Sequence, residues 1–446
     1  MLLREVEGEV TTLLSDLIRI NTTNPPGNET EAASYLAKVL EEDGLDCEIL
    51  ESAPGRGNLV ARLKGTGEKP SLLLLSHLDV VAANPGEWSV NPFSGVVKDG
   101  FVWGRGAIDM KSMTAIEVMV MKLLKRNNVK LKGDVILAAT ADEERGGEAG
   151  AEWLVRNHPE KVMASYVINE GGGQAIPIDG KNVFTIQTAE KGILWLKIKA
   201  KGSPGHGSLP GAADNAILRM CRVIERLGNH RAGIALIPTV VQFLTVLAEG
   251  NNSIKEVASL LRNPDVADNV LDMLAQRDKA MAEEIRAMMR MTIAPTIVHG
   301  GVKENIIPSE CEAVFDCRIL PGQSISEAFK SIRSLLGDIE KLEFEVIQSN
   351  EPSESPTDTP LYQFIVKVLR EFEPECLVTP IMLTGGTDSR FFRRLGAVCY
   401  GFHPLRSDLP YGEILKMIHG VDERISVENL VFGTSVLYNV VERFMT

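Results

Sequence analysis

The sequence predicts an α/β fold in which a mixed, mostly parallel sheet is flanked by helices and interrupted by an inserted α+β domain. Helical and strand patterns alternate over residues 1–190, a half-buried strand pattern begins after Gly192, and α/β patterning returns after a polar stretch at 349–358. A chain of 446 residues also exceeds one ordinary hydrophobic core. We therefore expect two domains.

The first part of the chain carries the patterns of an α/β layer structure. Apolar residues recur at helical spacing near the N-terminus and before Gly44, and short apolar runs farther on are typical of strands buried on both faces. The predicted elements are helices at 3–20, 32–42 and 112–124, strands at 72–75, 135–140 and 166–168, and the second arm of a hairpin at 101–103.

A change of pattern follows Glu190. Apolar and polar residues alternate from Ile193 to Ala200, which predicts a strand with one open face. The predicted elements are then a strand at 193–200, a glycine-rich turn at 202–207, a helix at 214–227, a strand at 311–319, a helix at 325–336, a linker at 349–358, a helix at 360–372, strands at 381–383 and 397–402, and a helix at 427–444. We expect residues 1–190 and 351–446 to form one discontinuous domain and residues 191–350 to form the inserted domain.

The composition narrows the class of protein. The formal charge of −13 argues against nucleic acid or an anionic membrane as a partner, and no apolar stretch is long enough to span a bilayer. Acidic residues at 5, 7 and 9 argue against a secretory signal. The six cysteines show no paired spacing, which indicates reduced thiols and predicts a cytoplasmic protein.

Several side chains able to bind a metal follow the predicted strands. His77 and Asp79 are two residues apart and share one face of an extended chain, so Asp79 can fix the tautomer of His77 while the other ring nitrogen binds a metal. Further candidates at element ends are Asp109, Glu143, Glu144 and Glu170. Each also has an ordinary structural interpretation, as a strand-end histidine, a helix cap or a loop acid. Together, so many acids at the ends of buried strands require a cation.

The types of these residues indicate which metal and what chemistry to expect. Carboxylate and imidazole ligands without thiolate suit zinc, manganese or cobalt. A single catalytic zinc needs only three protein ligands and a water, so this larger set favours two ions about 3.5–4 Å apart with a bridging carboxylate. Such a pair is typical of hydrolases.

The motifs extend over most of the chain and come in the order of a known family. They include Ser76-His77-Leu78-Asp79, Asp142-Glu143-Glu144 and Gly385-Gly386-Thr387-Asp388-Ser389-Arg390. The full set lies at 76–81, 88–95, 104–111, 142–144, 169–171, 205–207, 305–308, 316–318, 385–390 and 419–423. The sequence resembles the dizinc family that includes acetylornithine deacetylase, succinyl-diaminopimelate desuccinylase, aminoacylase and glutamate carboxypeptidase. The resemblance implies a zinc-peptidase-type catalytic domain with an inserted lid or dimerisation domain.

The resemblance also implies a role for each ligand of two divalent ions, with zinc expected first and cobalt or manganese as alternatives. Asp109 would bridge both ions, His77 and Glu170 would complete one site, and Glu144 and His419 would complete the other.

For the chemistry, the resemblance implies that Glu143 is the general base, taking a proton from the water at the metals and passing it to the leaving nitrogen. Asp79 would orient His77. The peptide bond Asp109–Met110 is expected to be cis, as it often is in this family.

Residues of the inserted domain and of the motif at 385–390 are expected to contact the substrate. The resemblance makes His206 a donor to the developing oxyanion, often supplied by the second subunit of a dimer; alternatively His206 is simply exposed. A substrate carboxylate would be held by Asn305, Arg318 and Arg390, with backbone donors from Gly385, Gly386 and Thr387. A surface salt bridge is the alternative for each arginine. A homodimer through the inserted domain follows as an expectation.

One segment departs from the compact relatives. A helical, charged stretch at 240–292, which includes Asp272 to Met291, resembles the extended branch near carboxypeptidase S and the long-chain N-acyl-amino-acid hydrolases. Added helices could narrow the choice of substrate or replace a dimer contact.

The expected activity is hydrolysis of an amide bond next to a free carboxylate, of the carboxypeptidase or dipeptidase type, on a small peptide. The alternative is an N-acyl-amino-acid deacylase of the acetylornithine deacetylase, desuccinylase or aminoacylase type. A non-catalytic metal-binding scaffold is a remote alternative, since every expected ligand and Glu143 are present. A two-metal phosphodiesterase would require more converging histidines than this sequence offers.

Overall fold

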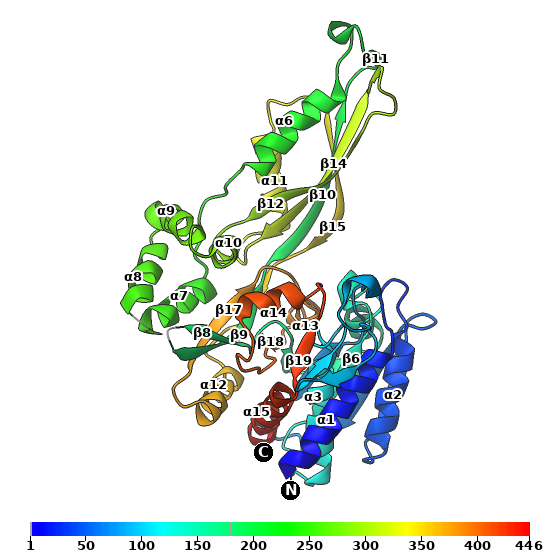
Figure 1. The fold of residues 1–446 in the computed structure, drawn as a ribbon, viewed down its shortest axis with the longest axis vertical. Coiled ribbons are helices and arrows are strands. Elements are labelled where there is room, and N and C mark those ends of the chain that lie inside the picture. Colours follow the sequence, from blue (N-terminus) through cyan, green and yellow to red (C-terminus); the bar gives the residue numbers. More distant parts are fainter. Residues whose placement is uncertain (1, 179, 251) are drawn as a thin grey trace.

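A large mixed sheet forms the centre of the computed structural model, which describes residues 2–178, 180–250 and 252–446 (Figure 1). The strands follow the order β1-β2-β6-β3-β7-β18-β9-β16, and β17 and β8 also pair with β9. The central neighbours β6, β3, β7 and β18 are parallel. The strands are β1 (Cys47–Glu51), β2 (Gly57–Leu63), β3 (Leu72–His77), β6 (Val135–Thr140), β7 (Tyr166–Asn169), β8 (Ala175–Ile178), β9 (Lys181–Glu190), β16 (Ser353–Glu354), β17 (Leu377–Leu383) and β18 (Val398–Gly401).

Helices cover both faces of this sheet, which accounts for the continuous apolar runs in its central strands. Successive residues of β3 point into opposite layers, so Leu74 packs in one hydrophobic core and Leu73 in the other. The helices around the sheet are α1 (Leu2–Arg19), α2 (Glu29–Glu41), α3 (Lys111–Arg126), α4 (Ala151–Asn157), α5 (Pro159–Val162), α12 (Pro360–Phe372), α13 (Ser389–Arg393), α14 (Tyr411–Met417) and α15 (Val427–Met445). The mixed, helix-flanked sheet is the architecture predicted from the sequence.

A second, antiparallel sheet of four strands, in the order β12-β14-β10-β15, extends away from the first (Figure 1). Its strands alternate between buried and more exposed residues, and α6 and α11 pack on the buried face. The elements are β10 (Gly192–Lys201), β11 (Gly205–His206), α6 (Ala216–Gly228), β12 (Thr292–Gly300), β13 (Ile306–Ile307), β14 (Glu310–Ile319), α11 (Ile325–Leu335) and β15 (Leu342–Asn350).

The helical stretch that departs from compact relatives has an unexpected position. It comprises α7 (Pro238–Gly250), α8 (Asn252–Leu261), α9 (Pro264–Ala275) and α10 (Lys279–Met288). Its apolar residues share a core with Val183 of β9 and Ile381 of β17, strands of the large sheet. By packing, these helices therefore belong with the large sheet, although the proposed boundaries at 190/191 and 350/351 place them in the inserted segment.

Two local expectations need correction. The predicted linker at 349–358 contains the end of β15 and the short strand β16, which pairs with β9. The helical run Asp272 to Met291 is divided between α9 and α10, because Asp278 caps the start of α10 by accepting a hydrogen bond from the Met281 N–H at 3.0 Å.

The central strands should dominate the stability of the large domain. Leu74 of β3 is fully buried, so Leu74→Ala is expected to lower the free energy of unfolding by about 2–5 kcal/mol. The same change at Leu218, which is 64% exposed on α6, should cost less than about 0.5 kcal/mol. Urea unfolding followed by circular dichroism measures both, and equal losses would contradict this assignment of the core.

Candidate metal centre and active site

The parallel strands place their carboxyl ends at one edge of the sheet, and each is followed by a polar side chain at that edge. His77 ends β3, Glu143 and Glu144 follow β6, Glu170 follows β7 and His403 follows β18. This is the edge at which open α/β sheets form their sites.

Asp109 and His419 reach the same edge from distant parts of the sequence. Asp109 lies between β5 (Phe101–Trp103) and α3, and His419 lies between α14 and β19 (Arg424–Ser426). In a small sheet with β4 (Val96–Lys98), β19 pairs antiparallel with β5, so the two segments are held side by side. The Asp109–Met110 peptide bond is cis, as expected from the sequence.

The structure brings the five expected metal ligands together as two triads that share Asp109. One triad is His77, Asp109 and Glu170, the other is Asp109, Glu144 and His419, and the donor atoms within each lie within 4.8 Å of one another. Asp109 Oδ1 lies 3.1 Å from His77 Nε2, and its Oδ2 lies 3.1 Å from His419 Nε2. Asp109 thus presents one oxygen to each triad, as a bridging carboxylate must.

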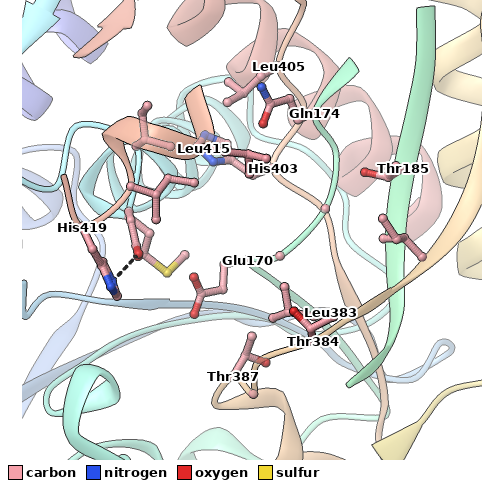
Figure 2. A pocket seen from close by; sticks show the side chains of 18 of the residues that line it. Glu170, Gln174, Thr185, Leu383, Thr384, Thr387, His403, Leu405, Leu415 and His419 are labelled. Atoms are coloured by element: carbon pink, nitrogen blue, oxygen red, sulfur yellow. Dashed lines mark ion pairs between the residues drawn. The ribbon is translucent and has the colours of Figure 1, made fainter. Parts of the chain in front are cut away.

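The remaining carboxylates complete the triads. Glu170 Oε1 lies 3.9 Å from His77 Nε2, and Glu144 Oε2 lies 3.2 Å from His419 Nε2. Figure 2 shows Glu170 and His419 directed into the same pocket. Oxygen and imidazole donors in this arrangement suit a pair of divalent ions.

The electrostatics of the triads also fit bound cations. Burial and the negative charges of Asp109 and Glu144 raise the pKa of Glu170 to about 8, although the charge of His77 opposes the shift. Hydrogen bonds to Asp109 and Glu144 raise the pKa of His419 to about 10. In the metal-free chain these groups retain protons because the carboxylates lack a counter-charge. A divalent ion in each triad would supply that charge.

Asp79 contacts the backbone of Glu143 and Glu144 as well as the side chain of His77. Its carboxylate lies 3.4 Å from His77 Nδ1, although that nitrogen is closer, at 2.9 Å, to the Asp79 carbonyl oxygen. Its Oδ1 accepts a hydrogen bond from the Glu143 N–H at 3.0 Å, and its Oδ2 accepts one from the Glu144 N–H at 3.2 Å. Asp79 therefore also fixes the backbone of both glutamates, which the sequence did not predict.

Glu423 has a comparable role at Asp109 and was not assigned from the sequence. This buried carboxylate accepts hydrogen bonds from the N–H groups of Ile108 and Asp109, at 2.7 and 2.9 Å, through Oε1. Its Oε2 accepts from Arg105 at 2.8 Å. The signal was its position in the motif 419–423, four residues after His419.

Four of the five triad residues line a cavity of about 320 Å³, namely Asp109, Glu144, Glu170 and His419, and Glu143 lines it as well. Two other lining residues, Gln174 and His403, were missed in the sequence, although His403 follows a predicted strand (Figure 2). The Nε2 atom of each is buried and has no hydrogen-bond partner among the described residues. Burial lowers the pKa of His403 to about 4, so its imidazole is neutral at physiological pH.

Part of the expected substrate-binding set lies at this cavity. Gly386 and Thr387 line it, whereas Gly385 is not among the lining residues. The Thr387 N–H is already engaged, donating to Glu190 at 2.8 Å. Arg390 is buried and donates to the carbonyl oxygens of Thr387 and Gly146 at 2.8 and 2.9 Å, so it secures the loop in this arrangement.

The expected contacts from the inserted domain lie elsewhere. His206 is exposed on β11, at the end of the second sheet remote from the large one, and its Nδ1 lies 2.7 Å from Ser208 Oγ (Figure 1). The carbonyl oxygen of Asn305 accepts a hydrogen bond from Gly207 N–H in the same tip. Arg318 is paired with Asp316 of its own strand at 2.7 Å. None of the three lines the cavity in this arrangement of the chain.

Comparisons with known proteins agree with this geometry. The sequence profile of Peptidase family M20/M25/M40 matches residues 73–443. The chain is 30% identical over 387 residues to the N-fatty-acyl-amino acid synthase/hydrolase PM20D1 of Homo sapiens, covering 84% of this chain and 75% of that protein. It is 27% identical over 411 residues to Aminoacylase-1A of Rattus norvegicus, covering 90% and 88%.

Solved structures share the fold. The M20 family metallo-carboxypeptidase Sso-CP2 from Sulfolobus solfataricus aligns with a TM-score of 0.73 at 18% identity, over 97% of this chain and 98% of that one. Human carnosine dipeptidase 1 aligns with a TM-score of 0.69 at 15% identity, over 99% and 98%. The profile match covers most of the chain, so this protein belongs to Peptidase family M20/M25/M40 and is a metal-dependent amide hydrolase.

Proposed function

We propose that this chain hydrolyses the amide bond of a small substrate whose amino-acid part has a free carboxylate, with two divalent ions, most suitably zinc, in the Asp109-centred triads. The observation that carries the proposal is Asp109 itself, which presents one carboxylate oxygen to His77 and the other to His419. When bound, two such ions would polarise the scissile carbonyl and lower the pKa of a water molecule.

Glu143 is the proposed proton carrier. It lines the cavity but belongs to neither triad, and Asp79 fixes its backbone by accepting a hydrogen bond from its N–H. Burial and the charge of Glu170 raise the pKa of Glu143 well above its ordinary value. A carboxylate in that position can take a proton from the attacking water and return it to the leaving nitrogen.

The loop at 385–387 is the proposed site of the substrate carboxylate. Gly386 lines the cavity, and the buried guanidinium of Arg390 lies against the same loop, within 3.5 Å of where a Gly386 Cβ would be. For a closed arrangement of the inserted domain, we propose that His206 stabilises the oxyanion. The further substrate contacts proposed for that arrangement come from Gly385, Thr387, Arg318 and Asn305.

The cavity wall favours an N-acyl amino acid over a dipeptide as the substrate. The apolar lining residues include Ile381, Met382, Leu405, Leu415 and Ile418. An apolar acyl group suits such a wall better than the charged amino terminus of a dipeptide. PM20D1 and Aminoacylase-1A, by their names, act on this class, whereas the carboxypeptidase and dipeptidase among the structural neighbours make small peptides the second candidate. A homodimer through the inserted domain and a cytoplasmic location remain predictions.

None of the helices in the part of the chain that the structure describes has the length and apolar character needed to cross a membrane.

A hydrolysis screen with a Glu143 variant tests the proposed function. The zinc-loaded protein should release the amino acid from N-acyl amino acids, and Glu143→Gln should retain two ions while losing at least about 100-fold in kcat. Glu144→Gln is the matched control, because this neighbour belongs to a triad and its loss should reduce the metal content. If Glu143→Gln released the amino acid at the parent rate, Glu143 would not be the proton carrier.

The pH dependence of metal stabilisation provides a separate test. Because Glu170 and His419 have raised pKa values in the metal-free fold, their contribution to its stability is lost as pH rises through about 8 and about 10. Lys111 and Lys191, whose pKa values burial lowers to about 7, act in the opposite direction on the stability of the metal-free fold.

We therefore expect the Tm difference between zinc-loaded and chelator-treated protein to increase between about pH 6 and about pH 9, since metal binding must displace these protons. Glu170→Gln should reduce the increase. Differential scanning calorimetry measures it, and a difference that is constant or shrinks over this range would contradict the proposed ligands.

A further inference from the structure

A second, smaller cavity of about 40 Å³ lies beside the active-site cavity. Nine of its ten lining residues are apolar, and they come from α7, α10, β8, β9 and β17. The lining residues are Ile176, Ile178, Val183, Phe243, Leu247, Met281, Glu284, Ile285, Met288 and Ile381.

The two cavities share part of their walls. Ile381 and Glu284 line both. On β9, Thr185 lines the larger cavity and Val183 lines the smaller one, and residues two apart on a strand point the same way. Thr185 lies at the side of the larger cavity away from His419 (Figure 2). The smaller cavity therefore adjoins the active-site cavity on the side away from His419.

The smaller cavity owes its existence to the added helices. The apolar residues of α7 and α10 that line it pack in one cluster with Val183 of β9 and Ile381 of β17; they are Phe243, Leu247, Ile285 and Met288. Protein cores ordinarily leave few voids larger than a water molecule. A void with apolar walls does not hold water well, but it accepts apolar ligands. Space left open beside a catalytic site is thus suited to an apolar part of the substrate.

We infer that this smaller cavity is the subsite for the alkyl chain of an N-acyl amino acid, an inference that rests on the proposed function. It selects acyl groups of medium length or longer over acetyl. The subsite is lined by no arginine, lysine or histidine among the described residues, and the carboxylate-bearing Glu284 lines both cavities. A succinyl or glutamyl group, with its second carboxylate, would be disfavoured there.

The size of the cavity predicts the form of the selectivity. Each methylene that is removed from water on binding raises the binding constant about fourfold. A volume of 40 Å³ holds about three water-sized groups, so the gain should continue over about three or four methylenes and then level off. Acetyl and propionyl groups should be bound in the larger cavity alone.

The test measures kcat/KM of the zinc-loaded full chain on N-acyl leucines, from acetyl through butanoyl, hexanoyl, octanoyl and decanoyl to dodecanoyl. Met281→Trp places a larger side chain in the cavity. Met273→Trp is the matched control, because Met273 is 59% exposed on α9 and lies outside the cavity.

The parent protein and Met273→Trp should show the rise and plateau, while Met281→Trp should lose at least about tenfold on octanoyl and longer substrates and stay within about twofold on acetyl. Retained acetyl turnover shows that the variant is folded. If Met281→Trp does not fold, the parent series decides alone.

A flat or falling series in the parent, or a loss by Met281→Trp that is equal for all chain lengths, would overturn the subsite. Failure of the proposed function has a different signature. In that case no N-acyl amino acid is hydrolysed at any chain length, whatever residue occupies position 281.

Discussion

Asp109, Glu144 and Glu170 line one cavity, and the negative charge they concentrate there is the constraint on which the rest of the structure depends. Among the described residues, the groups paired with these carboxylates are His77 and His419, and the pKa of each is raised as a result. Divalent cations relieve this repulsion far better than protons can, since they leave the carboxylates ionised and the imidazoles neutral. The site is therefore built for metal, and hydrolysis follows from what such ions do to water and carbonyl groups.

The surrounding fold holds these charges in place through carboxylates that bind backbone. Asp79 receives the N–H groups of Glu143 and Glu144, and Glu423 receives those of Ile108 and Asp109. Both are buried, and both fix residues of the site by more than one hydrogen bond. This arrangement places Glu144 in a triad and leaves the adjacent Glu143 at the cavity beside it, as the proposed proton transfer requires. The added helices then shape the region beyond the triads.

Much of this could be predicted from the sequence, because the relevant signals are local. The apolar runs of β3, β6 and β7 identify central strands, and the residues that follow them identify the site edge. His403 gave the same signal after β18 but stood outside the motifs. The strands β1, β2, β8, β9, β12 and β15 were not predicted, and of these β12 and β15 are largely exposed and lack a continuous apolar run. The packing of α7–α10 on β9 and β17 could not be predicted either, because it depends on which of two apolar faces a helix meets after the chain has folded.

The most direct test of the two-ion site is a crystal structure of the zinc-loaded protein with anomalous scattering recorded at the zinc edge. Two peaks about 3.5–4 Å apart are expected, one on each side of the Asp109 carboxylate. A single peak, or zinc bound away from Asp109, would contradict the account.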